Sequence, residues 1–336
     1  MRKKVTMQDI ADQLNISKNS VSQALSGKPG VSEETRQRVI QMAKELGYTY
    51  SNNKFLNKDK PKNIALIASN HTFSLKSFFG EIYLNVEREI NRRGYTLLIQ
   101  SINEDYKDQL ILPPIIKNNQ IDGIIVLSHI SSEYINMVIE TGIPTVVIDH
   151  HYPNMKADAV LTNNRFGAFT AIEHLIKLGH SDIAFVGNIN YSPSYYERLE
   201  GYLLAFHQYS LKVDPQFLFT DTLETENYIK SLINRLKKHP TAWFCVNDGL
   251  GYLINTQLQQ YNVKVPDMAS VCSYDNGQLS KISTPKITTM DINLDYFARR
   301  SVEQLLWRME HPHEPFQEIL LPSKLIQRES TTAPPK

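Results

Sequence analysis

Four polar residues lie where strand ends and a helix could present them to a small ligand. Asp149, Asn247 and Asp275 each follow an apolar run, and Arg198 lies early in a predicted helix. A carboxylate accepts hydrogen bonds from neighbouring hydroxyl groups, and a guanidinium donates to them. Together they suit a polyol or a sugar bound in a cleft. The alternative is structural: Asp and Asn here cap the following helices, and Arg198 pairs with a carboxylate.

Three aromatic residues are candidates to stack on the face of such a ligand. They are Phe79, Tyr195 and Trp243. Flat apolar rings suit the apolar face of a sugar, but aromatic residues near strand ends also belong to protein cores. The sequence leaves both roles open for each of the three.

The sequence predicts no metal site and no cofactor. His150-His151 resembles half of a metal site, but no third ligand follows at a suitable spacing, so solvated loop histidines are the interpretation. His311 and His313 receive the same interpretation. No G-x-S-x-G, G-x-G-x-x-G or G-x-x-x-x-G-K motif occurs. An α/β enzyme would need such a motif or a nucleophile–base pair, so we predict that the chain is not an enzyme.

The first 50 residues show the pattern of three short helices. Thr6, with Asp9 three positions later, is a helix N-cap signal, and Asn15 tolerates the left-handed conformation of a tight turn. Ser17 caps a second helix, and Ser32 opens a third. Two short helices joined by a tight turn and braced by a third describe a helix-turn-helix, whose second helix enters the major groove of DNA.

The charge of the chain is distributed in the way that DNA binding requires. Residues 1–60 hold 11 Lys and Arg against 6 Asp and Glu, whereas the remaining residues hold 25 against 29. A basic head on a mildly acidic body indicates that the head alone meets a polyanion. The predicted DNA contacts are Thr6, Ser17, Lys18, Asn19, Ser22 and Gln23 in the head, and Phe55 and Leu56 beyond it. The alternative is a three-helix bundle that binds protein.

Residues 51–62 are polar and basic and predict a linker, and the rest alternates strands with helices. Such alternation predicts parallel α/β sheets, and two sets of strands predict two Rossmann-like subdomains with a cleft between them, where a ligand sits outside the carboxyl ends of the strands. Predicted strands are Asn63–Ser69, Tyr95–Gln100, Ile121–Leu127, Pro144–Asp149, Asp182–Val186, Thr241–Val246 and Met268–Ser273. Predicted helices lie near 77–93, 106–119, 131–141, 164–178, 194–209, 225–238 and 248–260.

The sequence resembles the lactose-repressor (LacI/GalR) family from position 5 to 331, apart from the linker. The resemblance is specific because many positions match at fixed spacing. In the head it rests on Val5-Thr6-Met7-Gln8-Asp9-Ile10-Ala11, Ser20-Val21-Ser22, Val31–Val39 and Leu46-Gly47-Tyr48. In the body it rests on Ile143–Asp149, Asn164–Gly167, His174–Gly187, Arg198–Tyr202, Pro240–Asp248 and Arg328–Thr331.

The resemblance implies a DNA-binding regulator whose body has the fold of periplasmic binding proteins. It implies that Asp149, Arg198, Asn247 and Asp275 contact an effector, and that a homodimer binds a pseudo-palindromic operator. The body, residues 63–336, would divide into an N-subdomain of about 63–162 and 292–322 and a C-subdomain of about 163–291 and 323–331. The expected function is a repressor of sugar-utilisation genes controlled by a sugar. A nucleobase or nucleoside effector, or a protein co-effector, is the alternative.

Two departures from the family pattern bear on DNA recognition. Gln23 stands where the family usually has Arg, and Gln favours adenine whereas Arg favours guanine. The linker lacks the Pro, Ala and Arg of the family's hinge helix, and Leu56 lies one position before the expected Leu. Phe55 or Leu56 could still act as a wedge in the minor groove. A third departure, His150 in place of a common Arg, concerns the effector.

Two further functions compete with this prediction. A secreted solute-binding protein would share the body fold, but it would need an export signal and no DNA-binding head. A DNA-binding protein whose body has lost its ligand would keep the head. The basic N-terminus has no apolar segment behind it, no run of 18 apolar residues occurs, and Cys245 and Cys272 lie in apolar runs typical of core. We therefore predict a cytoplasmic protein without a membrane contact.

Overall fold

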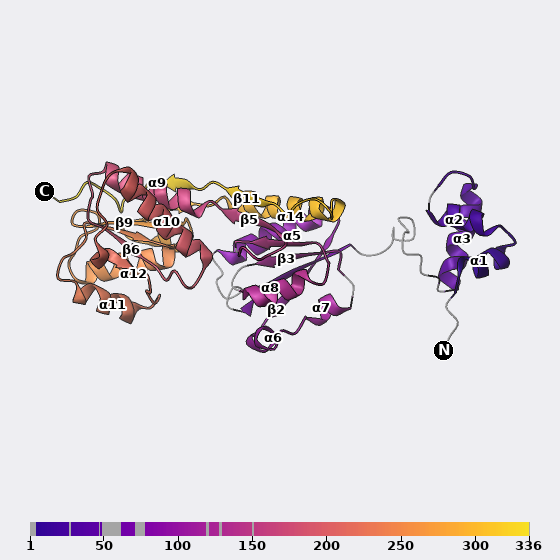
Figure 1. Cartoon of the computed structure of the whole chain (residues 1–336). Helices are drawn as coiled ribbons and strands as arrows, with labels where there is room; N and C mark the ends of the chain where they lie inside the picture. Colours follow the sequence, from indigo (N-terminus) through magenta and orange to yellow (C-terminus); the bar gives the residue numbers. More distant parts are fainter. Residues whose placement is uncertain are drawn as a thin grey trace. The chain divides into compact units, whose positions relative to one another are not determined.

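The computed structural model describes residues 5–26, 28–46, 48, 62–70, 78–118, 121–127, 130–149 and 151–335. The chain divides into two compact units, residues 1–61 and 62–336, called here the head and the body (Figure 1). Phe55 and Leu56, the two DNA contacts predicted in the linker, lie outside the described residues, as does His150. Among the described residues, no helix is long and apolar enough to cross a bilayer.

The head is the predicted helix-turn-helix. It consists of α1 (Met7–Leu14), α2 (Lys18–Ser26) and α3 (Glu33–Glu45). Thr6 and Asp9 form a reciprocal capping box at the start of α1, and Asn15 ends that helix in the left-handed region with φ 54°. The helices enclose a small apolar core made by Ile10, Ala11, Val21, Ala24, Leu25, Val39 and Ala43. Local capping chemistry therefore sets the turn between α1 and α2.

The body contains two six-stranded sheets, which confirms the predicted pair of α/β units. Sheet A has the order β11-β5-β4-β3-β1-β2, and sheet B has the order β12-β10-β9-β8-β6-β7. All neighbouring strands are parallel except β12, which is antiparallel to β10. Sheet A contains β1 (Asn63–Ser69), β2 (Thr96–Ile102), β3 (Gly123–Leu127), β4 (Thr145–Ile148), β5 (Asp158–Thr162) and β11 (Glu318–Leu321). Sheet B contains β6 (Ile183–Val186), β7 (Leu218–Phe219), β8 (Ala242–Cys245), β9 (Ser270–Asp275), β10 (Thr288–Asp291) and β12 (Lys324–Ile326).

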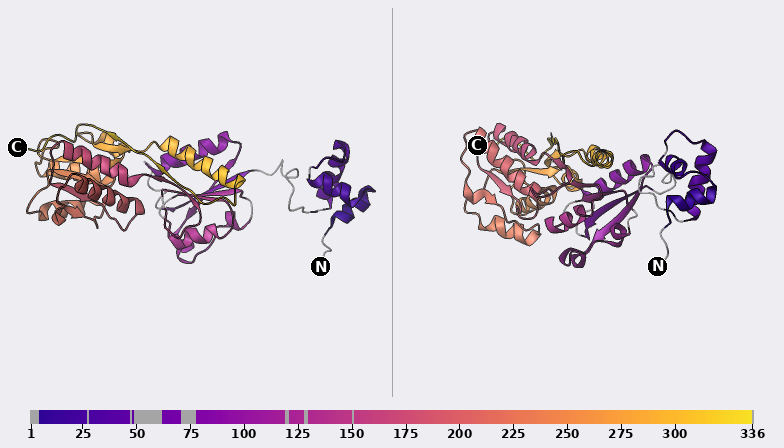
Figure 2. Two further views of the ribbon diagram at one scale, coloured as in Figure 1. Left: turned by 45° about the horizontal axis from the view of Figure 1, so that its top comes forward. Right: turned by 45° about the vertical axis from the view of Figure 1, so that its right-hand side comes forward.

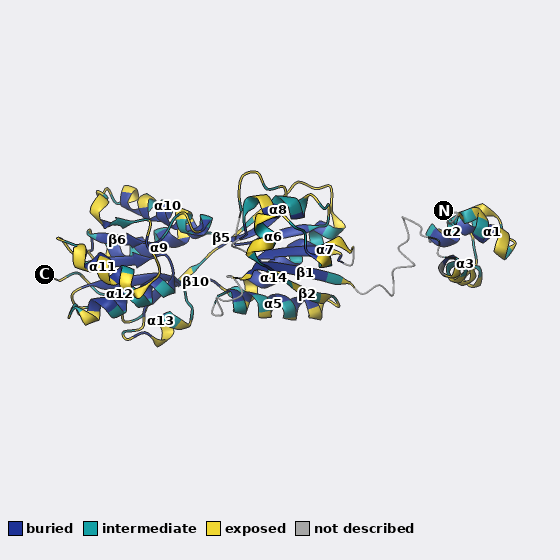
Figure 3. Ribbon diagram, turned by 90° about the horizontal axis from the view of Figure 1, so that it is seen from below, coloured by how far each residue is buried: buried dark blue, intermediate teal, exposed yellow. Residues whose placement is uncertain are grey.

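Helices cover both faces of sheet A because successive residues of its strands point to opposite sides. On one face, Ile64 and Leu66 of β1 pack with residues of α5 (Phe79–Arg92) and α14 (Leu294–Glu310). Ala65 and Ile67 pack on the opposite face. Figure 3 shows the strands as the buried interior. The helices of the sheet A half are α5 (Phe79–Arg92), α6 (Glu104–Asp108), α7 (Pro114–Lys117), α8 (Ser132–Ile139) and α14 (Leu294–Glu310). Those of the sheet B half are α9 (Asn164–Lys177), α10 (Pro193–Gln208), α11 (Glu226–Arg235), α12 (Asp248–Gln260) and α13 (Gln278–Ile282), with a 3-10 turn at Pro215–Phe217.

The chain passes between the two sheets three times within the described residues. It leaves sheet A after β5, returns from β10 to α14, and leaves again between β11 and β12. Helix α14 lies along α5 against sheet A, as the two views of Figure 2 show. These three connections are the covalent links across which the two halves of the body could move.

One predicted element of the body is wrong. The single helix expected near 106–119 is two short helices, α6 and α7, separated by a turn. Leu110 adopts φ 50° in this turn. Pro113 and Pro114 follow, and proline supplies no backbone N–H to continue a helix. A Pro-Pro pair inside an apolar pattern therefore marks a break that the periodicity alone does not reveal.

A fully buried ion pair joins α14 to β5. Arg308 donates to both carboxylate oxygens of Asp158, at 2.9 Å from Nε and 2.7 Å from a terminal nitrogen. The Asp158 side chain has no exposed surface, and that of Arg308 is 5% exposed. Arg308 also donates to the backbone carbonyls of Glu314 and Pro315, in the loop that leads to β11. The pair thus holds together an edge of sheet A that is built from two distant segments.

Candidate effector cavity and DNA-binding helix

A cavity of about 500 Å³ opens at the carboxyl ends of strands from both sheets. The sheet A half contributes Phe78, Phe79 and Asp149. The sheet B half contributes Asn188, Tyr191, Ser192, Ser194, Tyr195, Arg198, Thr222, Leu223, Glu224, Asn247, Asp248, Gly249, Asp275, Gly277, Gln278 and Leu279. Six of the seven predicted effector residues therefore line one cavity. Its volume and its mixture of aromatic and polar walls are those of a small-molecule site.

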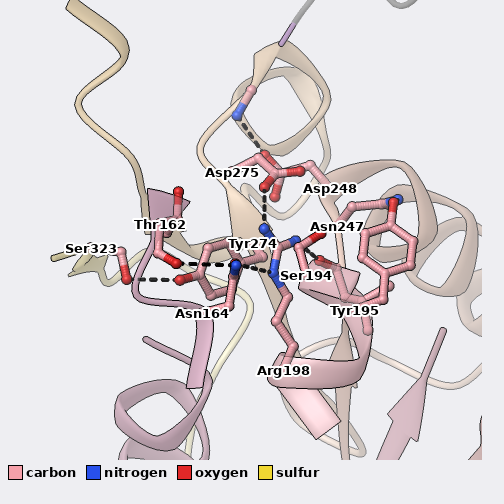
Figure 4. Close-up of polar contacts among 12 residues, drawn as sticks. Thr162, Asn164, Ser194, Tyr195, Arg198, Asn247, Asp248, Tyr274, Asp275 and Ser323 are labelled. Atoms are coloured by element: carbon pink, nitrogen blue, oxygen red, sulfur yellow. Dashed lines mark hydrogen bonds and ion pairs between the residues drawn. The ribbon is translucent and has the colours of Figure 1, made fainter. Parts of the chain in front are cut away.

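Arg198 lies at the centre of the polar wall (Figure 4). Its α-carbon is placed by α10, which starts with the cap Ser192 and Pro193. Nε donates to Asn164 Oδ1 at 3.0 Å, one terminal nitrogen donates to the Val246 carbonyl, and the other lies 3.3 Å from Asp275 Oδ1. The guanidinium also lies 3.7 Å from the centroid of the Tyr274 ring. Arg198 is therefore fixed in position by partners on four sides.

Asp275 is the last residue of β9 and has φ 101°, a conformation that is costly for a residue with a side chain. Burial raises the pKa of its carboxyl, and Arg198 opposes that effect. The structural alternative for this pair is therefore correct in part, because Arg198 does pair with a carboxylate. Both side chains also line the cavity, so the pair is a preformed acceptor and donor for a ligand.

Asn247 likewise has both of the roles considered for it. Its Oδ1 accepts from the Leu250 N–H at 2.8 Å and caps α12. Its Nδ2 faces the cavity wall and donates to Glu224 Oε1 at 2.8 Å and to the Tyr195 hydroxyl at 2.5 Å. The capping hydrogen bond at Oδ1 thus fixes the side-chain amide of Asn247 with its Nδ2 toward the cavity wall.

Asp149 follows β4 in the left-handed region, with φ 56°. The residue is 7% exposed, and its Oδ1 has no hydrogen-bond partner among the residues that the structure describes. Burial raises its pKa to about 7, Arg198 lowers it, and Asp275 and Glu197 raise it further. A buried acceptor without a donor is costly unless a ligand supplies one.

The aromatic candidates fall into two groups. Phe79 and Tyr195 line the cavity, together with Phe78 and Tyr191. Trp243 instead lies in the core of sheet B, with no exposed surface and its ring stacked on Phe219 at 6.1 Å. It does not line the cavity. Trp243 lies within β8, a strand that is buried on both faces. The predicted ligand contact for Trp243 is therefore wrong, because its ring points into the core and not to the carboxyl end of the strand.

The predicted DNA contacts of the head lie at the start of α1, in the turn before α2 and along α2. Thr6 and Ser17 act as caps, with Ser17 Oγ accepting from the Ser20 N–H at 3.0 Å. Lys18 and Asn19 are exposed. Ser22 and Gln23, which are also predicted DNA contacts, are half-buried.

Gln23 packs against the loop after α2. A β-carbon added to Gly30, which has φ 125°, would lie 2.9 Å from Gln23 Oε1. Arg36 of α3 anchors the same loop by donating to the carbonyls of Ala24 at 3.1 Å and Lys28 at 3.0 Å. The amide of Gln23 therefore lies beside Gly30 and keeps part of its surface exposed.

Comparison with known proteins places both units in one family. The model described as "Bacterial regulatory proteins, lacI family" matches residues 6–51, and that of a periplasmic binding protein-like domain matches residues 172–331. The transcriptional repressor PurR of Actinobacillus pleuropneumoniae is 30% identical over 311 residues, covering 91% of this chain and 91% of the relative. The chain belongs to the LacI family. It is a DNA-binding transcription regulator.

Two other members of the LacI family are similar over most of this chain. The ribose operon repressor of Haemophilus influenzae is 28% identical, and the match covers 97% of this chain and 98% of that relative. A LacI family regulator of Enterococcus faecium, solved with bound ribose, is 25% identical with a TM-score of 0.68, and the match covers 81% of this chain and 99% of that one. The fold predicted from the sequence is thereby confirmed.

The structure of this LacI-family chain adds cavity residues that the sequence did not single out. Glu224 lines the cavity from the loop between β7 and α11, and no sequence motif in this loop indicates a ligand contact. Asp248 follows the predicted Asn247, and its carboxylate accepts from Ser273, from Thr289 at 2.7 Å and from the Gly277 N–H at 2.5 Å. Burial raises the pKa of Asp248 to about 6. An acidic residue directly after the helix cap Asn247 was the available signal.

His151 corrects the interpretation of solvated loop histidines. Its side chain is 29% exposed, and its two ring nitrogens lie 2.8 Å from Glu197 Oε1 and 3.3 Å from Glu318 Oε1. The hydrogen bond with Glu197 is the main cause of its raised pKa. Since Glu197 belongs to α10 and Glu318 to β11, His151 joins the two halves of the body. His311 and His313 are exposed, and no group of three metal-binding side chains occurs among the described residues.

Proposed function

We propose that this LacI-family regulator is a repressor controlled by a small hydroxylated effector, such as a sugar, bound in the cavity between the two sheets. The observation that carries the proposal is the Arg198–Asp275 pair, which faces the cavity beside the amide of Asn247. The pair offers a hydrogen-bond donor and an acceptor at fixed positions, as neighbouring hydroxyl groups require. The ribose in the Enterococcus faecium relative supports this ligand class.

Control of DNA binding requires that the effector binds two arrangements of the body with different affinity. Phe79 and Asp149 come from one half of the body and Arg198 and Asp275 from the other, so a ligand that contacts all four favours one spacing of the halves. The working unit in this proposal is a cytoplasmic homodimer that acts by binding and not by catalysis. Its N-subdomains, about 63–162 and 292–322, form the main interface, and its C-subdomains comprise about 163–291 and 323–331.

A planar nucleobase is the second candidate effector. Four aromatic side chains, Phe78, Phe79, Tyr191 and Tyr195, line the cavity, and planar bases stack on such rings. Calorimetric titration of the full chain with a panel of sugars and a panel of nucleobases separates the two candidates. Binding of a sugar that also changes operator affinity supports the main proposal. Binding of nucleobases alone contradicts it.

We predict that Gln23 reads a base in the major groove. The Gln23→Ala variant should lose about 1–3 kcal/mol of operator affinity at one base pair and relax the preference there. The matched control is Lys18→Ala, which should weaken binding to all sequences alike and reduce its salt dependence. Binding-site selection with both variants measures the difference. An unchanged base preference for Gln23→Ala would contradict the assignment.

We also predict that two heads bind two half-sites at a fixed spacing. One helix-turn-helix contacts too few bases to define a site, and a two-fold dimer doubles the contacts. Inserting two or three base pairs between the half-sites should therefore reduce operator affinity to that of a single half-site. Sedimentation of the free protein measures the dimer. A monomer that binds one half-site as tightly as the full palindrome would refute this prediction.

A further inference from the structure

The described walls of the effector cavity carry an excess of negative charge. Four carboxylates line it, those of Asp149, Glu224, Asp248 and Asp275, against the single guanidinium of Arg198. A smaller adjoining hollow adds Glu81, Asp291 and Asp295 against Lys281. An electrostatic potential of this sign attracts cations and repels anions.

The positive charge of Arg198 is already used by the protein. Its three nitrogens donate to Asn164, to the Val246 carbonyl and to Asp275, and its face is covered by the Tyr274 ring. A phosphate or carboxylate on the effector would therefore have to compete with Asp275 for Arg198. Such a group would also meet the Asp149 carboxylate in the same cavity, and like charges brought together are a strong penalty against a wrong ligand.

Asp149 is the independent observation that points to a ligand. The residue is 93% buried, lines the cavity, and receives no hydrogen bond at Oδ1 from any described part of the chain. Its carboxylate makes no ion pair with any residue that the structure describes. Asp248, by contrast, accepts three hydrogen bonds from the protein. Among the described carboxylates that line the cavity, Asp149 is thus the buried one with an oxygen left for an outside partner.

We propose that the effector is a hydroxylated cation, an amino sugar, whose ammonium group lies against Asp149. The proposal rests on the sugar-binding function proposed above and names the charge of the ligand. An ammonium group supplies three donors and a charge that compensates a buried carboxylate, whereas a hydroxyl supplies one donor and no charge. The aromatic faces of Phe78, Phe79, Tyr191 and Tyr195 are compatible with a cation, because a ring face attracts positive charge.

The test compares sugars of the same ring that differ at one substituent, which is neutral, cationic or anionic. Calorimetry on the full chain uses glucose, glucosamine and glucose 6-phosphate, and then galactose, galactosamine and galacturonate. The amino sugar should bind about tenfold or more tighter than the neutral sugar of its set, the factor that one charge-assisted hydrogen bond supplies. The anionic sugar should bind more weakly than both. A neutral or anionic sugar that binds as tightly as the amino sugar overturns the proposal.

Variants locate the preference on one side chain. Asp149→Asn removes the charge with little change of shape, so the ratio of amino-sugar to neutral-sugar affinity should fall to about one. The control is Asp267→Asn at an exposed position, which should keep the wild-type ratio. An Asp149→Asn variant that retains the ratio overturns the assignment to Asp149. If a neutral sugar is preferred, only the charge inference fails. If no sugar binds, the proposed function fails as well.

Discussion

Replacing Arg198 with methionine should abolish the response of DNA binding to the effector. The change leaves the buried Asp275 carboxylate without its cation, and Asn164 Oδ1 and the Val246 carbonyl without their donor. Breaking one partner of a buried ion pair costs about 3–5 kcal/mol. That cost falls on the stability of the body. The effector itself loses a charged donor, worth about 1.5–3 kcal/mol, so its affinity should fall by roughly tenfold to a hundredfold. Operator affinity should persist, because the DNA-binding head has its own core.

The measurement is operator binding with and without the effector, beside calorimetry of effector binding. The matched control is Arg165→Met on α9, since the Arg165 side chain is 59% exposed and its ion pair with Glu200, at 3.8 Å, is a surface pair. Surface pairs contribute about 1 kcal/mol or less. An Arg198→Met protein that responds at the wild-type effector concentration would show that the cavity is not the site of control.

Replacing Asp158 with asparagine should lower the free energy of unfolding of the body by about 3–5 kcal/mol. Asparagine keeps the shape of the side chain but leaves the Arg308 guanidinium buried without a compensating charge. Urea unfolding followed by tryptophan fluorescence reports on the body alone, because both tryptophans, Trp243 and Trp307, belong to it. The effect is large because Arg308 also holds the loop before β11.

The control for this prediction is Asp182→Asn. Asp182 pairs with Lys238 at 2.8 Å, but the two side chains are 34% and 56% exposed. The loss of stability there should stay within about 1 kcal/mol. Equal losses for Asp158→Asn and Asp182→Asn would mean that the Asp158–Arg308 pair contributes no more than a surface pair does.

Local chemistry explains which parts of the molecule were predictable from the sequence. Thr6 and Asn15 are caps whose partners lie within a few residues, so the turn of the helix-turn-helix follows from the sequence. Asp149, Asn247 and Asp275 were predicted at the cavity because the carboxyl ends of parallel strands share one edge. Arg198 was predicted at the cavity because a helix was expected beside that edge of the sheet.

Other features depend on contacts between residues far apart in the chain. The partners of His151, Glu197 and Glu318, lie 46 and 167 residues away, so nothing near His151 reveals that it is bound. Trp243 shows the same limit, since an apolar run buried on both faces does not show which aromatic ring reaches a cavity. The strands β5, β7, β10, β11 and β12 were not predicted. Two of their pairings, β5 with β11 and β10 with β12, join segments that are separated in the sequence by at least one long helix.

The order of the strands in sheet A has a consequence for how the protein is made. β11 pairs with β5, at Leu321 with Thr162, and α14 covers α5, yet both elements follow the whole of sheet B up to β10 in the chain. On the ribosome, the first five strands of sheet A therefore emerge without their edge strand and without the helix that covers one face. Ribosomes synthesise chains from the N-terminus at about 5–20 residues per second, and the domain nearer the N-terminus normally folds first. The half that is synthesised first therefore waits for α14 and β11, so its β5 edge and the apolar side of α5 lack these partners until translation is nearly finished.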